Sequence, residues 1–349
     1  MKLRVIIIML CAVLVLSGCS PRPAGWQTGN VDLVRALGVD RAEGGVRVSA
    51  TVGAAQAASL AAAVQELCSM GDSVLHVGHV NQLVLGEDFA RDGAESLLDF
   101  VARDRQIGPG SRLWVLRGDA AERAVRGETD VSPRLTRLGE TFAGTAPKLD
   151  CTATRLMSVM AREGSVAVPA LTLEMGELAP AGYAVLRRGR LVGFLDREQS
   201  LGLELLCGQG AGQLVEVPLS ATEWTVLTVR RAKVEGVPEV ADGVLRSLRL
   251  RCEVRLEPAQ GGALSAAQME LVARQAESVL CGRMVAALAC AQLWDADVSG
   301  LERLARASCS DREWDDTNWE TSFRTLPLQV IAAARVRWPA DMEERGNEA

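Results

Sequence analysis

The residues best suited to defined chemistry are the last four of an apolar N-terminal run, 16–19, which read LSGC. Small residues directly before such a cysteine are typical of a lipobox, in which the preceding peptide is removed and the cysteine sulfur takes a diacylglycerol. We therefore expect cleavage between Gly18 and Cys19, and lipidation of Cys19 with acyl chains such as palmitate. The alternative is an ordinary secretory signal that contains a cysteine by chance.

The segment before this motif has the order of an export signal. Lys2 and Arg4 precede an apolar stretch over 5–16, which is shorter than the roughly 20 residues that a bilayer span needs. Residues 1–18 are therefore predicted to be a signal peptide, and the Pro/Gly-rich residues 19–30 a tether. Buried methylenes contribute about 0.8 kcal/mol each, so two or three acyl chains would give a durable membrane anchor.

The two histidines, His76 and His79, are the next candidates, because an i, i+3 pair on a helix could bind a metal ion. Their surroundings, VLHVGHVN, read as an extended segment, in which residues three apart point to opposite faces. No glutamate lies between them as in His-Glu-x-x-His, and the sequence offers no third ligand. We therefore predict no metal site.

No set of residues predicts catalysis. A serine-hydrolase Gly-x-Ser-x-Gly motif is absent, and the glycines of 208–212 (GQGAG) follow a predicted helix without the Lys-Ser/Thr of a phosphate loop. A cluster of acidic residues near two tryptophans could serve acid–base or sugar chemistry, but a solvated loop with docked tryptophans is the simpler interpretation. These residues are Glu313, Asp315, Asp316 and Glu320, with Trp314 and Trp319. We expect no catalytic residues and no cofactor.

The bulk composition is that of a globular protein, with 48% hydrophobic and 23% charged residues. The net charge is −6 and no basic block is present, so nucleic acid is not an expected partner. Beyond the motif, the cysteines have wide spacings and no Cys-x-x-Cys pair. We favour buried free thiols, although export would permit disulfides. These cysteines are Cys68, Cys151, Cys207, Cys252, Cys281, Cys290 and Cys309.

Short strands and helices alternate in the first half of the predicted folded part. Strands are predicted over 33–39, 46–52, 80–85 and 112–116, and helices over 54–70, 87–103, 119–125 and 152–162. Asp119 is expected to cap the helix that ends at Val125. Residues 127–150 carry many turn formers and are predicted to be a loop. This order predicts a mixed sheet with helices packed on it.

Longer elements follow in the second half. A hairpin is predicted over 181–195 with its turn at Arg188-Gly189, then a helix over 196–207 and strands over 224–234 and 245–256. Ser265 and Gln268 form a capping box that opens a helix to about Trp294. A short helix over 300–307 and an alternating strand over 326–338 complete the chain. The predicted fold class is α+β, with mixed or antiparallel sheets, packed helices and one long helix. The predicted modules are 31–175, 176–212 and 213–349.

Several segments, taken in order, carry a family resemblance. They are the LSGC motif, 37–40 (LGVD) with the strand 46–52, 76–87 (HVGHVNQLVLGE), 97–104 (LLDFVARD), 182–185 (GYAV), 191–195 (LVGFL), 202–203, 297–300 (DVSG), 314–323 and the last strand. Together they resemble the Ger(x)C family, the lipoprotein C subunits of nutrient germinant receptors in endospore-forming bacteria. The family often has Trp-Asp-Arg-Arg-Glu after the lipidated cysteine, whereas this chain has SPRP at 20–23.

The resemblance implies a non-enzymatic protein whose one chemically defined site is Cys19. It implies assembly with two integral membrane subunits, A and B, into a receptor that responds to nutrients and triggers germination; contact with a small-molecule nutrient would be indirect. It also implies a lipid-anchored position on the outer face of the inner spore membrane. Confinement to one membrane raises the effective concentration of the subunits. Residues 80–103 and the C-terminal strand are expected to carry interface surface, because matching segments cluster there.

The alternative functions make different structural demands. A solute-binding lipoprotein of a transporter would have two Rossmann-like lobes of repeated βα units joined by a hinge, which the long strands after Trp224 and the long helix disfavour. A lipoprotein hydrolase would need a nucleophile motif that the sequence lacks. The receptor subunit is therefore the favoured interpretation, and the transporter protein is its alternative.

Overall fold

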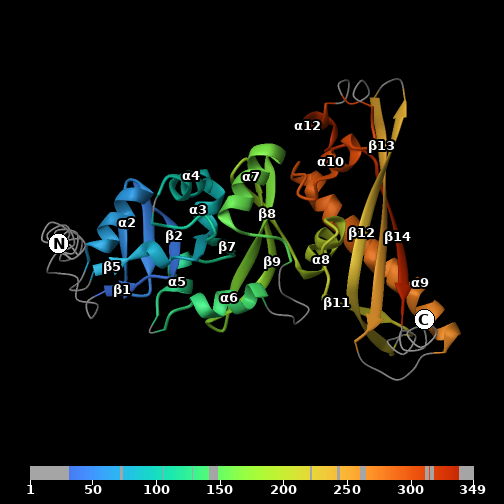
Figure 1. The fold of residues 1–349 in the computed structure, drawn as a ribbon, viewed down its shortest axis with the longest axis horizontal. Coiled ribbons are helices and arrows are strands. Elements are labelled where there is room, and N and C mark those ends of the chain that lie inside the picture. The colour runs from blue at the N-terminus through green and yellow to red at the C-terminus, as the bar shows by residue number, and fades with distance from the viewer. Residues whose placement is uncertain are drawn as a thin grey trace, which may run out of the picture.

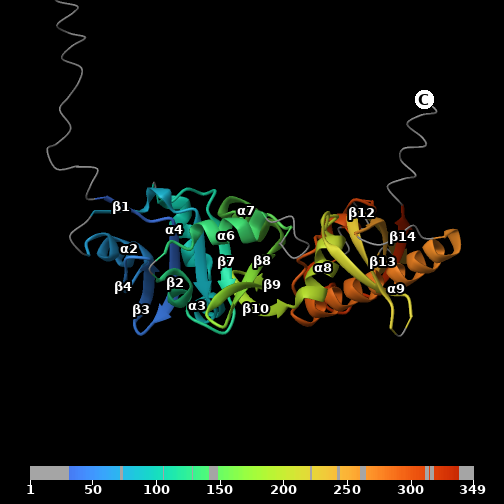
Figure 2. The same ribbon diagram turned by 90° about the horizontal axis from the view of Figure 1, so that it is seen from below.

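The structure is a computed structural model that describes residues 31–337 except 71–73, 105, 128, 141–147, 221, 242–243, 260–264, 311–313 and 315–317. The predicted signal peptide, the tether and Cys19 lie outside the described residues, as do Glu313, Asp315 and Asp316. Two large sheets lie toward opposite ends of an elongated molecule, and the view from below keeps the same separation (Figures 1 and 2). The predicted α+β fold class is confirmed.

The first sheet has eight strands. In spatial order they are β10 (Arg190–Leu195), β9 (Glu177–Arg187), β8 (Ser165–Glu174), β7 (Arg112–Leu116), β6 (Gln82–Gly86), β2 (Ala36–Ala42), β3 (Gly45–Ala50) and β4 (Gly53–Ala57). The four central strands β2, β6, β7 and β8 are parallel, and the hairpins at both edges are antiparallel. A small parallel pair, β1 (Val31–Leu33) and β5 (Val74–His76), lies beside it.

Helices cover both faces of the first sheet, because successive side chains of its central strands point to opposite sides. Leu83 and Leu85 of β6 belong to the core under one layer of helices, whereas Val84 and Trp114 belong to the core under the other. The first layer consists of α2 (Leu60–Cys68), α3 (Glu87–Asp92), α4 (Glu95–Arg103) and α7 (Ala153–Glu163). The second consists of α5 (Ala121–Val125) and α6 (Ser132–Glu140).

Three predictions in this half are wrong in detail, and one strand was missed. Residues 53–57 form β4 rather than the start of the helix, because they pair with β3. The helix expected over 87–103 is two helices, since Gly93 has a φ of 142° that ends the first. Part of the loop expected over 127–150 is the helix α6. The strand β8 was not predicted at all.

The start of α5 differs from the sequence prediction as well. Its first two backbone N–H groups, at Ala121 and Glu122, donate to the two carboxylate oxygens of Asp40 at 2.6 and 2.8 Å. Asp40 is buried near the end of β2, so the capping side chain comes from another element. The predicted cap, Asp119, accepts instead from the N–H of Ala120.

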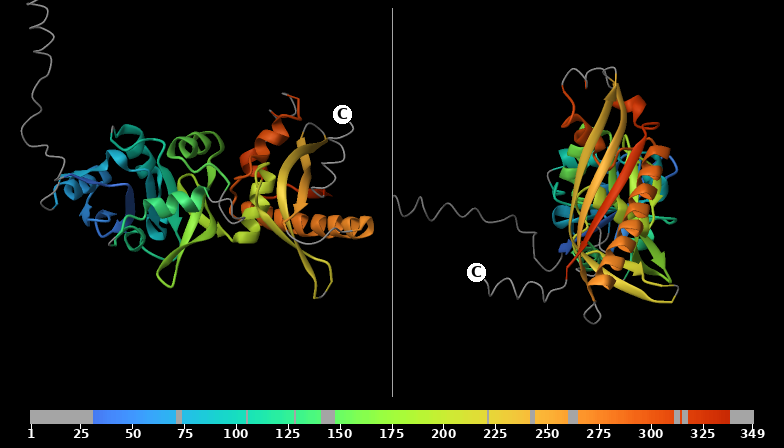
Figure 3. Two further views of the ribbon diagram at one scale, coloured as in Figure 1. Left: turned by 60° about the horizontal axis from the view of Figure 1, so that its bottom comes forward. Right: turned by 90° about the vertical axis from the view of Figure 1, so that its right-hand side faces the viewer.

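The second sheet has four strands and a helix layer. Its order is β11 (Leu214–Pro218), β12 (Trp224–Ala241), β13 (Val244–Pro258) and β14 (Leu328–Val336), with β14 parallel to β13. The long helix α9 (Ala266–Leu293) contacts β14 and β11, and it begins with the predicted capping box of Ser265 and Gln268. Figure 3 shows β12, β13, β14 and α9 together at one end of the molecule.

Three shorter helices complete the second half. They are α8 (Arg197–Leu206), α10 (Leu301–Arg306) and α12 (Trp319–Ser322). The hairpin predicted around Arg188-Gly189 is confirmed as β9 and β10, and the helix predicted over 196–207 is α8 with its own capping box at Asp196. The core under the second sheet also takes in Tyr183 and Leu195 of that hairpin, so the hairpin contributes to both halves of the molecule.

Candidate functional site

The sequence candidates do not assemble into a reactive site among the described residues. His76 ends β5 and His79 lies in the 3₁₀ helix η2 (Val77–His79), so the extended conformation predicted for this segment is wrong after His76. The two imidazole rings have centroids 5.8 Å apart, and Nδ1 of His76 accepts from the N–H of Gly78. No group of three or more potential metal ligands gathers in the part of the chain that the structure describes.

Two other candidates occupy structural positions. The glycines at 208, 210 and 212 have positive φ angles and form turns after α8, as predicted for this segment. Trp319 is buried and stacks between Trp314 and Phe323. Glu320 is exposed and forms an ion pair with Arg188.

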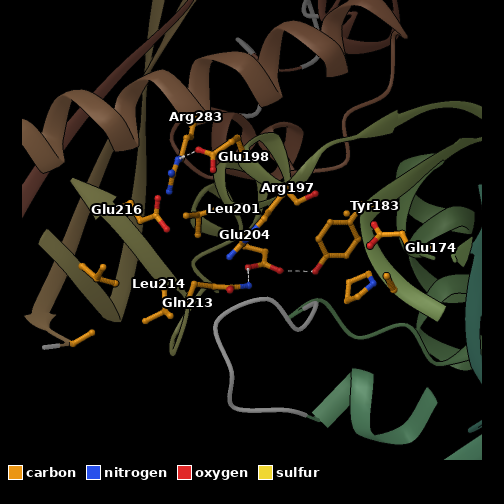
Figure 4. Close-up of a pocket in the computed structure, with 16 residues that line it drawn as sticks. Glu174, Tyr183, Arg197, Glu198, Leu201, Glu204, Gln213, Leu214, Glu216 and Arg283 are labelled. Carbon is orange, nitrogen blue, oxygen red and sulfur yellow. Dashed lines mark hydrogen bonds and ion pairs between the residues drawn. The ribbon is translucent and has the colours of Figure 1, made fainter. Parts of the chain in front are cut away.

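A cleft of about 710 Å³ lies where the hairpin of the first sheet meets α8, β11 and α9. We call it the junction cleft, and Figure 4 shows its lining. Its floor contains Tyr183 of β9, Glu204 of α8 and Gln213, all of them buried. Arg283 of α9 and Glu198 of α8 lie together at another part of the wall and form an ion pair.

Glu204 is the centre of a hydrogen-bond network on the cleft floor. Its Oε1 accepts from the Tyr183 hydroxyl at 2.7 Å and from the backbone N–H of Lys148 at 2.9 Å. Its Oε2 accepts from the Gln213 amide at 2.6 Å. Figure 4 shows Tyr183 and Gln213 pointing toward this carboxyl group from opposite sides. The network therefore ties α8 to β9 and to the segments at 148 and 213.

Burial sets the electrostatics of this network. Desolvation raises the pKa of Glu204, although the hydrogen bonds from Tyr183, the Lys148 N–H and Gln213 oppose that rise. Burial, together with the nearby Glu204 charge, also raises the pKa of the Tyr183 hydroxyl well above 10.0. The hydroxyl is therefore a hydrogen-bond donor at neutral pH. The arrangement suits a structural tie between two parts of the molecule.

Sequence reasoning missed this network, although two signals were present. Glu204 lies in LGLELL at 201–206, and a lone carboxylate in an apolar helical run is usually buried with a partner. Tyr183 is the one tyrosine in the chain. The donor from Lys148 is a backbone group of a distant loop, and no sequence pattern predicts that contact.

Three of the cysteines are not activated thiols. Burial raises the pKa of Cys151 to about 11, and that of Cys207 and Cys252 to about 12. A thiolate is the reactive form, so these three side chains stay protonated at neutral pH. Cys68, Cys281 and Cys290 are free thiols as well, but they are only partly buried, whereas the sequence interpretation favoured buried thiols.

One helix among the described residues, α9, is long and apolar enough to cross a membrane by length and composition. The core helix of a folded domain passes the same test. Here Val272, Ala276, Leu280 and Met284 are buried against the second sheet, at the spacing of one helix face. We therefore interpret α9 as a core helix.

Comparisons with known proteins cover nearly the whole chain. Residues 29–173 match the family model described as the spore germination protein N-terminal domain, and residues 181–339 match the model described as spore germination B3/GerAC like, C-terminal. The crystal structure of the GerBC protein has a similar fold, with a TM-score of 0.61 and 15% sequence identity, over 86% of this chain and 96% of that one. No curated protein sequence matches the chain.

Proposed function

The chain belongs to the spore germination family of GerAC-like proteins, and from this membership we propose that it is the lipoprotein C subunit of a nutrient germinant receptor. The observation that carries the proposal is the match of both halves, in order, to the two models of one family. The fold likeness to GerBC covers almost all of that protein and supports the same assignment of fold.

In this proposal the protein is not an enzyme and acts through assembly. It joins two integral membrane subunits, A and B, and the complex triggers germination in response to nutrients. Cys19 carries the lipid that holds the protein at the outer face of the inner spore membrane. The described residues support the non-enzymatic part of this proposal. The buried carboxylate of Glu204 accepts three hydrogen bonds, and burial keeps the thiols of Cys151, Cys207 and Cys252 protonated.

The fold also bears on the transporter alternative. A solute-binding protein with two Rossmann-like lobes would repeat one βα arrangement in both halves. Here the first sheet is mixed with helices on both faces, and the second consists of long strands beside one long helix. The two halves therefore differ in architecture, which favours the receptor subunit.

The test is germination of spores that lack the gene, with wild-type or Cys19→Ala copies restored, across a panel of single nutrients. Calcium dipicolinate serves as the receptor-independent trigger. We expect loss of the response to some nutrients, full recovery with wild type, and weak recovery with Cys19→Ala at equal protein level. Normal germination to every nutrient, in a strain that also lacks any paralogous gene, would contradict the proposal.

A second measurement addresses assembly. The A and B subunits of the proposed receptor are purified from spore membranes through a tag on A, and the amount of this chain that accompanies them is measured. We expect wild-type chain in stoichiometric amount. Absence of the chain from a complex that retains A and B would contradict assembly. That result alone would not test the lipid anchor at Cys19.

A further inference from the structure

One face of the second sheet is covered by no helix among the described residues. The helices α9 and α10 pack on the face that contains Leu248, Leu250 and Gly236. Alternate residues of β12, β13 and β14 point the other way and are exposed, as the burial pattern of β13 shows most clearly. This open face is long because β12 and β13 pair over most of their length.

The strand register places three arginines side by side on the open face. Arg231 of β12 is directly opposite Arg255 of β13, and Arg255 is directly opposite Arg335 of β14. All three are exposed, and the next residue pairs along the strands, such as Val254 with Ala334, are buried on the other face. We call these three residues the arginine row.

The arginine row is unlike its neighbours on the same face. The next row contains Lys233 opposite Glu253, so opposite charges meet there, and Lys233 also forms an ion pair with Glu235 at 2.5 Å. Within the described part of the chain, no carboxylate forms an ion pair with Arg231, Arg255 or Arg335. Like charges directly opposite each other in a sheet are destabilising. The arginine row therefore lowers the stability of the isolated protein.

We propose that the arginine row is a docking site for an acidic segment of a partner protein, whose carboxylates neutralise the three guanidinium groups. Neighbouring strands are about 4.8 Å apart, so the row spans roughly 10 Å. An α-helix with glutamates at i, i+3 or i+4, and i+7 spans a similar distance at about 1.5 Å per residue. Each guanidinium can bind a carboxylate through two parallel hydrogen bonds.

A protein partner fits the surface better than an anionic lipid layer does. Adsorption to anionic lipid depends on clustered basic residues with little opposing charge. Here Glu253, Glu235 and Glu239 lie on the same open face, where they alternate with the basic residues Lys233, Arg251 and Arg249. A uniform anionic surface would leave these glutamates facing like charge, whereas a partner whose charges alternate in the matching order complements both signs. The inference goes beyond the proposed function, because it concerns a contact surface that family membership does not define.

The test uses the full-length chain in detergent and a synthetic Ala-rich helical peptide with glutamates at i, i+4 and i+7. Binding is measured by fluorescence anisotropy for wild type and for the triple variant Arg231→Gln, Arg255→Gln, Arg335→Gln. We expect the triple variant to bind at least tenfold more weakly. A peptide with glutamines in place of the glutamates should not bind, and binding should weaken with salt.

The matched control removes three other exposed arginines, Arg103→Gln, Arg123→Gln and Arg274→Gln, which lie on helices elsewhere. It changes the net charge equally and should bind the peptide within twofold of wild type. If the triple row variant unfolds at a lower denaturant concentration than wild type, the single variant Arg255→Gln replaces it, with an expected loss of at least threefold.

A second arm separates protein from lipid. Wild type and row variant are incubated with phosphatidylcholine vesicles, with and without phosphatidylglycerol, so that the lipid anchor contributes equally to both. Equal peptide binding by wild type and the row variant, or no binding by wild type, would overturn the proposal. If wild type prefers vesicles with phosphatidylglycerol, the row variant does not, and neither binds the peptide, the surface binds lipid instead. Either result leaves the germination test in spores unaffected. Failure of the docking-site proposal can therefore be told apart from failure of the proposed receptor function.

Discussion

Glu204 shows how a buried charge can be retained without a salt bridge. Its carboxylate accepts three hydrogen bonds, so donors rather than a cation offset part of the cost of desolvation. The donors come from β9, from residue 148 and from residue 213, which are far apart in sequence. Removal of the carboxylate would therefore leave a buried hydroxyl and a buried amide without their acceptor.

The raised pKa of Glu204 predicts a pH dependence of stability. Burial raises it above 4.5, so the folded protein binds this proton more tightly than the unfolded chain does. The contribution of protonated Glu204 to the free energy of unfolding is thus fully present below pH 4.5. It is lost as pH rises through the folded-state pKa of this side chain. We expect the free energy of unfolding of wild type to fall more steeply as pH rises above 4.5 than that of Glu204→Gln, measured by urea denaturation.

The glutamine variant is a suitable comparison because its amide oxygen can still accept from Tyr183 and Lys148. The Gln213 amide can rotate to present its oxygen to the new amide group. Asp40, Glu163, Asp297 and Glu302 also have pKa values raised by burial, so both proteins share their contribution. Equal pH slopes for the two proteins would show that Glu204 does not titrate in this range.

Asp40 caps α5 in place of the residue that the sequence predicted, so its substitution should have the larger effect. Its carboxylate accepts both first N–H groups of α5, and it is buried. Asp40→Ala would leave those donors unsatisfied, so we expect a loss of about 1–3 kcal/mol in the free energy of unfolding. Asp119→Ala, at the residue expected from the sequence to cap the helix, should cost less than about 1 kcal/mol, since its partners are exposed. Similar losses in urea denaturation would contradict this account.

At the scale of elements, local sequence signals predict the helices and strands whose ends are marked by a capping box or by turn residues. The capping box at Ser265 defines the start of α9, and the Arg188-Gly189 turn defines the hairpin. Alternation of apolar residues predicts β14 within two residues at each end. These features depend on neighbours in sequence, so a single chain is enough to identify them.

The elements that were missed depend on tertiary partners. Ala54 and Ala55 have high helix propensity, but hydrogen bonding to β3 makes them a strand. In β8, Pro169 weakens the strand signal, and the register shift between residues 169 and 171 accommodates it. The cleft floor could not be predicted, because Glu204 and Tyr183 meet only when α8 packs beside β9. Cys19, by contrast, remains a prediction from sequence alone.

The close approach of α8 and α9 predicts opposite effects for two glycines. A Cβ on Gly202 of α8 would lie 2.1 Å from the backbone oxygen of Arg283, so the helices would have to separate. We expect Gly202→Ala to cost about 1–3 kcal/mol in the free energy of unfolding. Gly282 of α9 has no atom within 4 Å of its Cβ position. Gly282→Ala should therefore stabilise the protein by up to about 1 kcal/mol through helix propensity.

Thermal unfolding of the two variants measures both effects. Gly202→Ala should unfold at a lower temperature than wild type and Gly282→Ala at an equal or higher one. Equal destabilisation by both substitutions would indicate that the close helix contact has no special cost, and that the two glycines act through flexibility instead.

At the scale of the whole molecule, the two sheets are joined by contacts from the β9–β10 hairpin. Trp294, at the end of α9, packs over Gly193 of β10, where a Cβ would lie 2.2 Å from the indole ring. Arg187 of β9 forms an ion pair with Asp295 in the same region. Together with Tyr183 and Glu204, these contacts hold the second half against the first.

This arrangement predicts that Gly193→Val uncouples the two halves. The new side chain would displace Trp294, while the core under the helices α2, α3 and α4 would stay intact. We expect calorimetry to resolve two unfolding transitions, with the first at a lower temperature than in wild type. Gly108→Val, on a loop with open space around its Cβ position, is the control. A single transition in the Gly193 variant would mean that the other contacts suffice for cooperativity.

Tyr183 has a consequence for how this junction can be observed. Because the chain has one tyrosine, isotopic labelling of that amino acid alone places a single magnetic resonance signal at the boundary between the two halves. Its ring carbons sense the hydroxyl hydrogen bond to Glu204, so their frequencies would report proton uptake there. A change in the relative orientation of the halves would shift the same signal, so this native residue would report such a change.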